Sequence, residues 1–251
     1  MRMAIPLILP LLGLALAAAL WAVATLLLAA DTPILANFAP LEALRALSGL
    51  AIDPLMWSHI GVSLQRVAIG LVVALAIGVP LGILTGVSRA FAHTTTPLFQ
   101  FLRMISPLSW MPIAVMVLGV GDAPVYFLLA FAAVWPILLN TAAGVAQLDR
   151  NWLMLARSLS ATRSETIFRV VLPGIVAHIL SGVRLAIGII WIILVPAEML
   201  GVSAGLGYFI LDARDRLAYP DLMAAILIIG ALGFALDYAA RWLYQHWLHK
   251  R

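Results

Sequence analysis

Six long, almost uncharged runs dominate this sequence and limit what the chain can fold into. A helix rises 1.5 Å per residue, so about 20 apolar residues are needed to cross the hydrocarbon core of a bilayer. The runs cover residues 3–30, 67–88, about 97–121, 123–147, 172–200 and 222–247. The pattern predicts an all-α fold, a polytopic bundle of six transmembrane helices.

The composition supports a membrane location. Hydrophobic residues make up 64% of the chain and charged residues 10%, whereas a soluble domain carries about 25% charged residues. The absence of cysteine excludes disulfides and thiolate metal sites, and we expect no metal site. The net charge of +4 does not indicate nucleic-acid binding, because the basic residues are spaced among the apolar runs.

The first run is too long for a cleaved secretory signal. It has 28 uncharged residues, against about 7–15 in the apolar part of a signal peptide. We therefore expect a retained helix, followed by an external segment that reaches residue 58. Within that segment, residues 41–50 are amphipathic and are predicted to lie along the membrane interface. Residues 59–251 would form the transport core.

The basic residues predict the orientation. With both termini in the cytoplasm, the outer segments hold only Arg45, Arg214 and Arg216, with Arg66 near the outer end of the second run. The inner segments hold Arg2, Arg89, Arg150, Arg157, Arg163, Arg169, Lys250 and Arg251. This asymmetry follows the positive-inside rule.

The longest inner segment, residues 148–171, predicts two short helices. One apolar stripe at helical spacing is formed by Trp152, Leu155, Ala156 and Leu159. Arg150 and Arg157 lie off this stripe, and Thr162 with Glu165 forms a capping-box pattern that begins the second helix. The pattern fits a rigid cytoplasmic protrusion, and equally a surface loop that folds back onto the bilayer.

The fifth run carries a charge at membrane depth. Arg184 lies about ten residues into this run, and a charge there must face protein or water. One helical face contains Ala177, Ser181, Arg184, Gly188, Trp191, Val195 and Glu198. We name Arg184, Trp191 and Glu198 as candidate pathway residues. The alternatives are that Arg184 ties two helices together and that Glu198 is a gate or packing residue.

The third and sixth runs add further candidates. Proline follows Ser106 and Met111, and each proline removes a backbone donor, so we expect the third run to be bent. Arg103, near its inner end, and Ser106 are candidate pathway residues. Asp237 and Arg241, one helical turn apart in the sixth run, are predicted to form a local ion pair.

Residues 148–171 resemble the cytoplasmic loop of binding-protein-dependent ABC importer permeases. That pattern is Glu-Ala-Ala, three residues, Gly, nine residues and Ile-x-Leu-Pro; here Leu172-Pro173 matches, Met154 replaces the Glu, and Ser160 replaces the Gly. Segments 63–67, 105–112, 135–141 and 182–201 resemble the nitrate, sulfonate, taurine and bicarbonate group of these type I permeases.

The resemblance implies a permease subunit that imports a small anion (nitrate, bicarbonate, a sulfonate or a taurine-like solute) across the bacterial cytoplasmic membrane. Two subunits, most simply a homodimer, would enclose the pathway and work with two ATPase subunits and an external solute-binding protein. The coupling residues would be Trp152, Leu155, Ala156, Arg157, Leu159, Ser160 and Thr162. This chain lacks a Gly-x-x-x-x-Gly-Lys phosphate loop, so ATP and Mg would bind to the ATPase, and this chain would bind no cofactor and would not be an enzyme.

The sequence disfavours two other classes of membrane protein. An ion-gradient-driven secondary transporter or channel subunit would favour acids near the membrane midplane and an inverted repeat, and the sequence shows neither. An intramembrane hydrolase would require a nucleophile motif such as Gly-x-Ser-x-Gly, which is absent.

Overall fold

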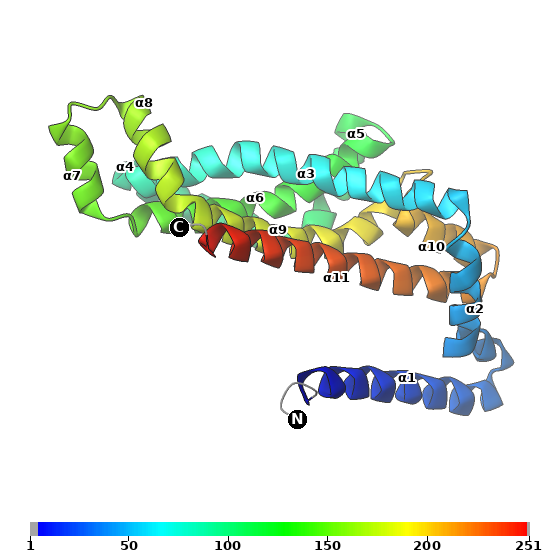
Figure 1. The fold of residues 1–251 in the computed structure, drawn as a ribbon. Coiled ribbons are helices and arrows are strands. Elements are labelled where there is room, and N and C mark those ends of the chain that lie inside the picture. The colour runs from blue at the N-terminus through cyan, green and yellow to red at the C-terminus, as the bar shows by residue number, and fades with distance from the viewer. Residues whose placement is uncertain (1–4, 250–251) are drawn as a thin grey trace. The chain divides into compact units, whose positions relative to one another are not determined.

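The computed structural model describes residues 5–249, and every regular element in that range is helical (Figure 1). This confirms the all-α class; Arg2, Lys250 and Arg251, used in the orientation argument, lie outside the described residues. The elements are α1 (Ile5–Asp31), η1 (Pro33–Phe38), α2 (Pro40–Leu50), α3 (Pro54–Val87), α4 (Arg89–Met104), η2 (Pro107–Trp110), α5 (Met111–Leu118), α6 (Asp122–Ala146), α7 (Arg150–Ser158), α8 (Arg163–Thr166), η3 (Ile167–Val171), α9 (Leu172–Glu198), α10 (Leu206–Asp215) and α11 (Tyr219–His249).

The membrane-spanning segments agree with the six predicted runs. In the described part of the chain, five helices are long and apolar enough to cross a bilayer, and the total is six if α4 and Pro107–Leu118, which are bent by 88° relative to each other, are counted as one span. Pro107 and Pro112 each stand in the first turn of a new helical segment, where a missing N–H is tolerated. The predicted bend of the third span is therefore confirmed.

The chain divides into two compact units, one made of residues 1–60 and 209–230, the other of residues 61–208 and 231–251. In the first unit, the Trp21 indole Nε1 donates to the Phe38 carbonyl at 3.0 Å, and the Phe38 ring packs 4.9 Å from Tyr219. The amphipathic helix predicted for residues 41–50 is present as α2, which buries Ala43 and Leu50. The predicted boundary at residue 58 between an N-terminal region and the transport core stays a prediction.

Within the second unit, α3 packs closely against α6 through a ladder of small residues. The ladder places one small side chain per helical turn, at Gly70, Ala74, Gly78, Gly82 and Gly86. A Cβ added at Gly82 would lie 2.6 Å from the Leu138 carbonyl oxygen and from the Thr141 Cβ. Glycine therefore lets the two helix backbones approach, as small residues do between membrane helices.

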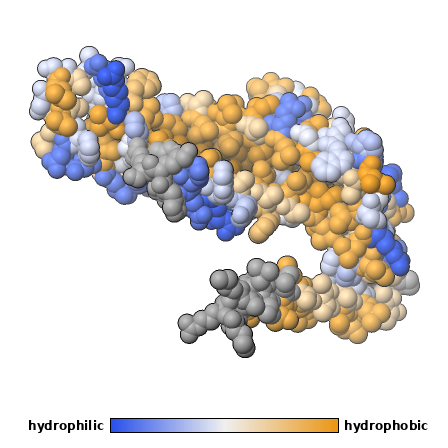
Figure 2. Space-filling view, viewed as in Figure 1, coloured by the Kyte–Doolittle hydropathy of each residue, from blue (hydrophilic) through white to orange (hydrophobic). Residues whose placement is uncertain are grey.

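Helix α9 packs on α6 in the same way and completes the core of this unit. A Cβ at Gly182 would lie 2.9 Å from the Ile137 Cα, and one at Gly144 would lie 2.8 Å from the His178 ring. On the face shown in Figure 2, apolar side chains cover the flank of α3, and hydrophilic residues gather where α7 and α8 lie.

The structure differs from the sequence expectation in the start of α3 and in the presence of α10. The external segment is expected to reach residue 58, but α3 begins at Pro54, where the Asp53 carboxylate accepts from the Leu55 N–H at 2.9 Å. This capped start extends the helix before the apolar run begins. Helix α10 was not predicted, because three charged residues, Asp212, Arg214 and Asp215, interrupt its apolar pattern.

Candidate functional site

The loop of residues 148–171, here called the coupling loop, is held by local caps. The Asp149 carboxylate accepts from the Asn151 N–H at 2.9 Å and starts α7. The capping box predicted at Thr162 is confirmed, since Thr162 Oγ accepts from the Glu165 N–H at 3.2 Å and Glu165 accepts from the Thr162 N–H at 2.9 Å. Helix α8 then continues through the π-helical η3 into α9. The second half of the loop is therefore an extension of a membrane-spanning helix.

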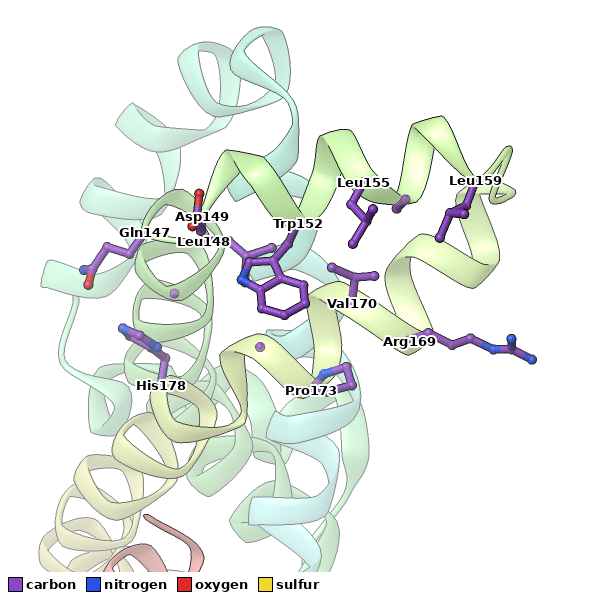
Figure 3. Close-up of a pocket in the computed structure, with 13 residues that line it drawn as sticks. Gln147, Leu148, Asp149, Trp152, Leu155, Leu159, Arg169, Val170, Pro173 and His178 are labelled. Atoms are coloured by element: carbon purple, nitrogen blue, oxygen red, sulfur yellow. The ribbon is translucent and has the colours of Figure 1, made fainter. Parts of the chain in front are cut away.

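A cavity of about 600 Å³ lies between α7 and the start of α9 (Figure 3). It brings together four predicted coupling residues, Trp152, Leu155, Ala156 and Leu159, with Val170, Pro173 and His178. Ala156 is buried, but Trp152, Leu155 and Leu159 remain 60%, 52% and 73% exposed. The apolar stripe of α7 is thus only partly covered by this chain.

The other three predicted coupling residues do not line this cavity. Arg157, Ser160 and Thr162 are exposed at the end of α7 and in the turn that follows. Ser160 has φ +55°, in the left-handed region, and the Ala161 N–H donates to the Ala156 carbonyl at 3.0 Å. This is the hydrogen bond of a Schellman helix end, which favours glycine at the position of Ser160. It also explains why α7 ends at Ser158.

The opposite end of α9 contains a buried charge cluster, defined here as Ser63, Arg66, Asp122 and Glu198. Arg66 is 3% exposed and Glu198 is fully buried. The Arg66 guanidinium donates to Glu198 Oε1 at 2.7 Å through Nη1, and to Asp122 Oδ1 at 3.0 and 2.6 Å through Nε and Nη2. Ser63 Oγ lies 2.8 and 2.9 Å from the two Glu198 oxygens. Both buried charges are therefore paired and hydrogen-bonded.

The loop after α9 closes over this cluster. The Gly207 N–H donates to Glu198 Oε2 at 2.9 Å, and the Ala204 carbonyl accepts from Arg66 Nη1 at 2.7 Å. Gly205 has φ +112°, and a Cβ there would lie 2.5 Å from both Arg66 Nη1 and Glu198 Oε1. Glu198 thus has the geometry of the packing alternative, and its predicted role in the pathway stays a prediction.

The other two candidates on α9 face α11. Arg184 Nε lies 3.4 Å from Asp237 Oδ1, and Asp237 also pairs with Arg241, which confirms the predicted local ion pair. A Cβ at Gly233 would lie 2.5 Å from Trp191 Nε1, so Trp191 packs on the same helix. The Arg184 and Asp237 side chains remain 43% and 41% exposed. Arg184 contacts a second helix, yet 43% of its side chain is open to a partner or to water, and its role in the pathway stays a prediction.

The two candidates on the bent third span lie apart. Arg103 lines a cavity of about 340 Å³ together with residues of η2, α6 and α9, here called the Arg103 cavity. Ser106 is exposed and does not line that cavity.

The sequence reasoning missed Ser63, Arg66 and Asp122 as members of one site. The available signal was their position, since Arg66, Asp122 and Glu198 all stand near ends of apolar runs predicted to face the same side of the membrane.

The sequence is similar over most of its length to three named transport permeases. It is 42% identical over 196 residues to the bicarbonate transport system permease protein CmpB of Synechococcus elongatus, covering 77% of this chain and 69% of that protein. It is 36% identical over 208 residues to the nitrate import permease protein NrtB of Leptolyngbya laminosa, covering 79% and 74%. The taurine transport system permease protein TauC of Escherichia coli is 31% identical over 223 residues, covering 88% and 81%.

Solved structures show the same fold. An inward-facing structure of the MetNI methionine ABC transporter superposes with a TM-score of 0.65 at 15% identity, covering 77% of this chain and 98% of that chain. A structure of an amino acid ABC transporter has a TM-score of 0.61 at 16% identity, covering 82% and 98%. The model of the family described as binding-protein-dependent transport system inner membrane component matches residues 78–249. The chain therefore belongs to this family and is a permease subunit of a type I ABC importer.

Proposed function

We propose that this permease imports a small inorganic or organic anion of the bicarbonate, nitrate or sulfonate class. Permeases of this family are transport subunits, and ATP is hydrolysed by separate ATPase subunits. The observation that carries the anion assignment is the identity of 42% and 36% to permeases named for bicarbonate and nitrate. Two cationic side chains on this chain, Arg103 and Arg184, support it, because cations beside a low-dielectric path favour anions.

The coupling loop is proposed as the contact for the ATPase. Its cavity is open, and its apolar wall holds three exposed side chains, Trp152, Leu155 and Leu159. Exposed apolar surface outside the membrane marks a site for a protein partner. The ATPase, with its own ATP and Mg, would insert side chains beside this stripe, and α8 would transmit the movement to α9 through η3.

The pathway is proposed to lie between two copies of this chain. Leu185, Ile189 and Ile192 are exposed along α9 on the subunit surface, close in sequence to the half-exposed Arg184. A charge at this depth is expensive against lipid, so a second subunit or a water-filled path must cover it. A homodimer is the simplest arrangement, and an external binding protein would deliver the solute.

A multi-span helical permease of this family is an inner-membrane protein. We propose that both termini are cytoplasmic, so that the coupling loop is inside and residues 31–53 are outside. Single cysteines at the exposed residues Ala36 and Ser158 test this in a chain without native cysteine. A membrane-impermeant thiol reagent added to intact cells should label Ala36→Cys and spare Ser158→Cys. The reverse labelling, or labelling of both, would contradict the proposed orientation.

The decisive experiment is transport in proteoliposomes. The permease, its ATPase subunits and the cognate binding protein should take up a small anion in an ATP-dependent manner. Nitrate, bicarbonate and short alkanesulfonates form the test panel, with a monovalent cation and a neutral sugar as controls. A cognate binding protein that binds only the cation or the sugar would refute the anion assignment.

A further inference from the structure

We propose that the Arg103 cavity is an anion-binding subsite of the translocation pathway, selective for small oxyanions that carry no ammonium group. This inference rests on the proposed function and adds a site and a substrate class to it. It is carried by two adjoining cavities, by unpaired hydrogen-bond donors in their walls, and by the absence of a carboxylate from those walls.

Arg103 joins the two cavities. The larger, of about 340 Å³, is lined by Arg103, by residues of η2 and α6, and by Leu185, Ile189 and Ile193 of α9. The smaller, of about 60 Å³, shares Arg103, Trp135 and Leu139 with it and adds Thr85, Thr96 and Gln100 among its lining residues. The larger cavity is at the lower end of the range of about 300–1,000 Å³ for small-molecule sites.

The shape of the bent third span explains why the cavity exists. Helix α4 ends one residue after Arg103, and η2 restarts at Pro107 after the break. Irregular backbone at membrane depth is tolerated where it lines a cavity. The break therefore leaves space beside α6 and α9, with the guanidinium at its edge.

The polar groups of the cavity walls include donors without acceptors. Arg103 makes no hydrogen bond or ion pair with any residue the structure describes, and its guanidinium carries five N–H donors. The Trp135 Nε1 is buried and lacks an acceptor within the described chain. Asn140 Nδ2 donates one hydrogen to the Pro136 carbonyl at 2.8 Å and has a second to give. The Arg103 side chain is exposed, whereas the Trp135 Nε1 is an unpaired buried donor, which is costly, and an oxyanion bound beside both would accept a hydrogen bond from it.

The walls of the two cavities offer no carboxylate as a counter-charge for a cation. Neither cavity is lined by Asp or Glu. The two acids that the membrane-spanning helices of this unit carry away from their first turns, Glu198 and Asp237, are already engaged by arginines. An ammonium group would enter an apolar space lined by Leu185, Ile189 and Ile193 without a counter-charge, which is unfavourable. Nitrate, bicarbonate or an alkanesulfonate fits this chemistry, whereas an amino-sulfonate does not.

Occupancy of this site can be measured without transport, because the native chain contains no cysteine. Leu139 lines both cavities and is partly exposed, so Leu139→Cys reports access to them. The permease–ATPase complex in detergent is treated with N-ethylmaleimide in sodium nitrate, sodium ethanesulfonate or taurine, with ionic strength balanced by sodium gluconate. Nitrate and ethanesulfonate should slow alkylation by about twofold once half of the sites are filled. Taurine, which differs from ethanesulfonate by its ammonium group, should not slow it.

Second-site variants separate anion binding from packing. Arg103→Gln should abolish protection by nitrate, and Trp135→Phe should weaken it, because each removes a donor and keeps the bulk. Trp110→Phe is the matched control, since Trp110 Nε1 is also buried without an acceptor but lines neither cavity. Protection should persist in Trp110→Phe. A cysteine at the highly exposed Met116, which lines neither cavity, should react at the same rate in every salt.

Three results would overturn the subsite: no protection of Leu139→Cys by nitrate, equal protection by taurine, or protection that persists in Arg103→Gln. ATP-driven anion uptake without protection would remove the subsite and leave the proposed function in place. Protection by nitrate without anion uptake would support the subsite and contradict the proposed function.

Discussion

The two ends of α9 differ in how far their side chains are buried and paired within this chain. At Glu198 the helix ends in buried charges that are fully paired inside the chain, and glycines bring the next loop into contact with them. At its N-terminal end, Leu172 follows a loop in which the apolar side chains of Trp152, Leu155 and Leu159 are more than half exposed beside a cavity. The first end is complete within one subunit. In the proposed assembly the second is completed by a partner, so damage to the first should affect folding and damage to the second should affect assembly.

The largest expected effect is at the charge cluster. Arg66→Met removes the cation that faces both Asp122 and Glu198, leaving a buried carboxylate without its counter-charge. Removing one partner of a buried pair costs about 3–5 kcal/mol. We expect the variant to unfold at a much lower temperature in detergent, or to fail to accumulate in the membrane.

The exposed pair of Arg214 and Asp215 supplies the control for this prediction. Arg214→Met should change stability by about 1 kcal/mol or less, as for other exposed ion pairs. If the two methionine variants melt at the same temperature, the charge cluster does not hold the fold together, and the contrast between the ends of α9 fails.

The second effect is at the coupling loop and should spare the fold. Leu155→Asp with Leu159→Asp places two charges on the apolar wall of the cavity. Burying a leucine side chain is worth about 1.5–3 kcal/mol, so each replacement should weaken ATPase binding about tenfold or more. We expect loss of ATPase co-purification and of transport, with the thermal stability of the permease unchanged.

Met154 gives a matched control on the same helix, because it is equally exposed but lies outside the cavity lining. Met154→Asp should retain the ATPase. If it releases the ATPase as strongly as the double variant does, the docking surface is not the stripe but the whole of α7.

Between the two ends, variants of Arg184 distinguish a role of the middle of α9 in anion transport from a role in helix packing. Arg184→Gln keeps hydrogen-bond donors and removes the charge, and we expect anion uptake to fall several-fold while assembly and basal ATPase activity persist. The exposed pair with Asp237 should contribute about 1 kcal/mol or less to stability. Asp237→Asn breaks the same pair and keeps the cation, so it should slow uptake less. Equal loss of uptake in both variants would assign Arg184 to helix packing.

Features that depend on neighbouring residues could be predicted from the sequence, whereas the long-range pairing at the Glu198 end of α9 could not. Spans, the capping box at Thr162 and the ion pair of Asp237 and Arg241 depend on residues within a few helical turns, so local patterns predicted them. The charge cluster depends on residues 56 and 132 positions apart, and an apolar run does not specify which distant charge its terminal residue meets. Arg66 and Glu198 were visible as polar residues near run ends, but their pairing follows from the register of α3 beside α6 and α9.

The coupling loop shows the reverse case, in which a departure from a family pattern became interpretable only with backbone angles. Ser160 stands where the resembling permeases carry Gly, and nothing in the sequence states whether that position needs a left-handed conformation. The structure gives φ +55° for Ser160, with the hydrogen bonds of a helix C-terminus around it. The serine keeps the conformation for which glycine is the favoured residue.

The smallest expected effect follows from that strain. A non-glycine residue in the left-handed region costs roughly 1–2 kcal/mol, so Ser160→Gly should stabilise the end of α7 by about 1 kcal/mol. The change removes no apolar contact of the cavity, because Ser160 does not line it. We expect slower amide hydrogen exchange across α7, with ATPase binding kept or slightly tightened. Ser158→Gly is the matched control: Ser158 is the last residue of α7, where glycine lowers helix propensity, so exchange there should become faster. Faster exchange in both variants would show that the turn at Ser160 carries no strain, and that the coupling loop depends on its partner even for its local conformation.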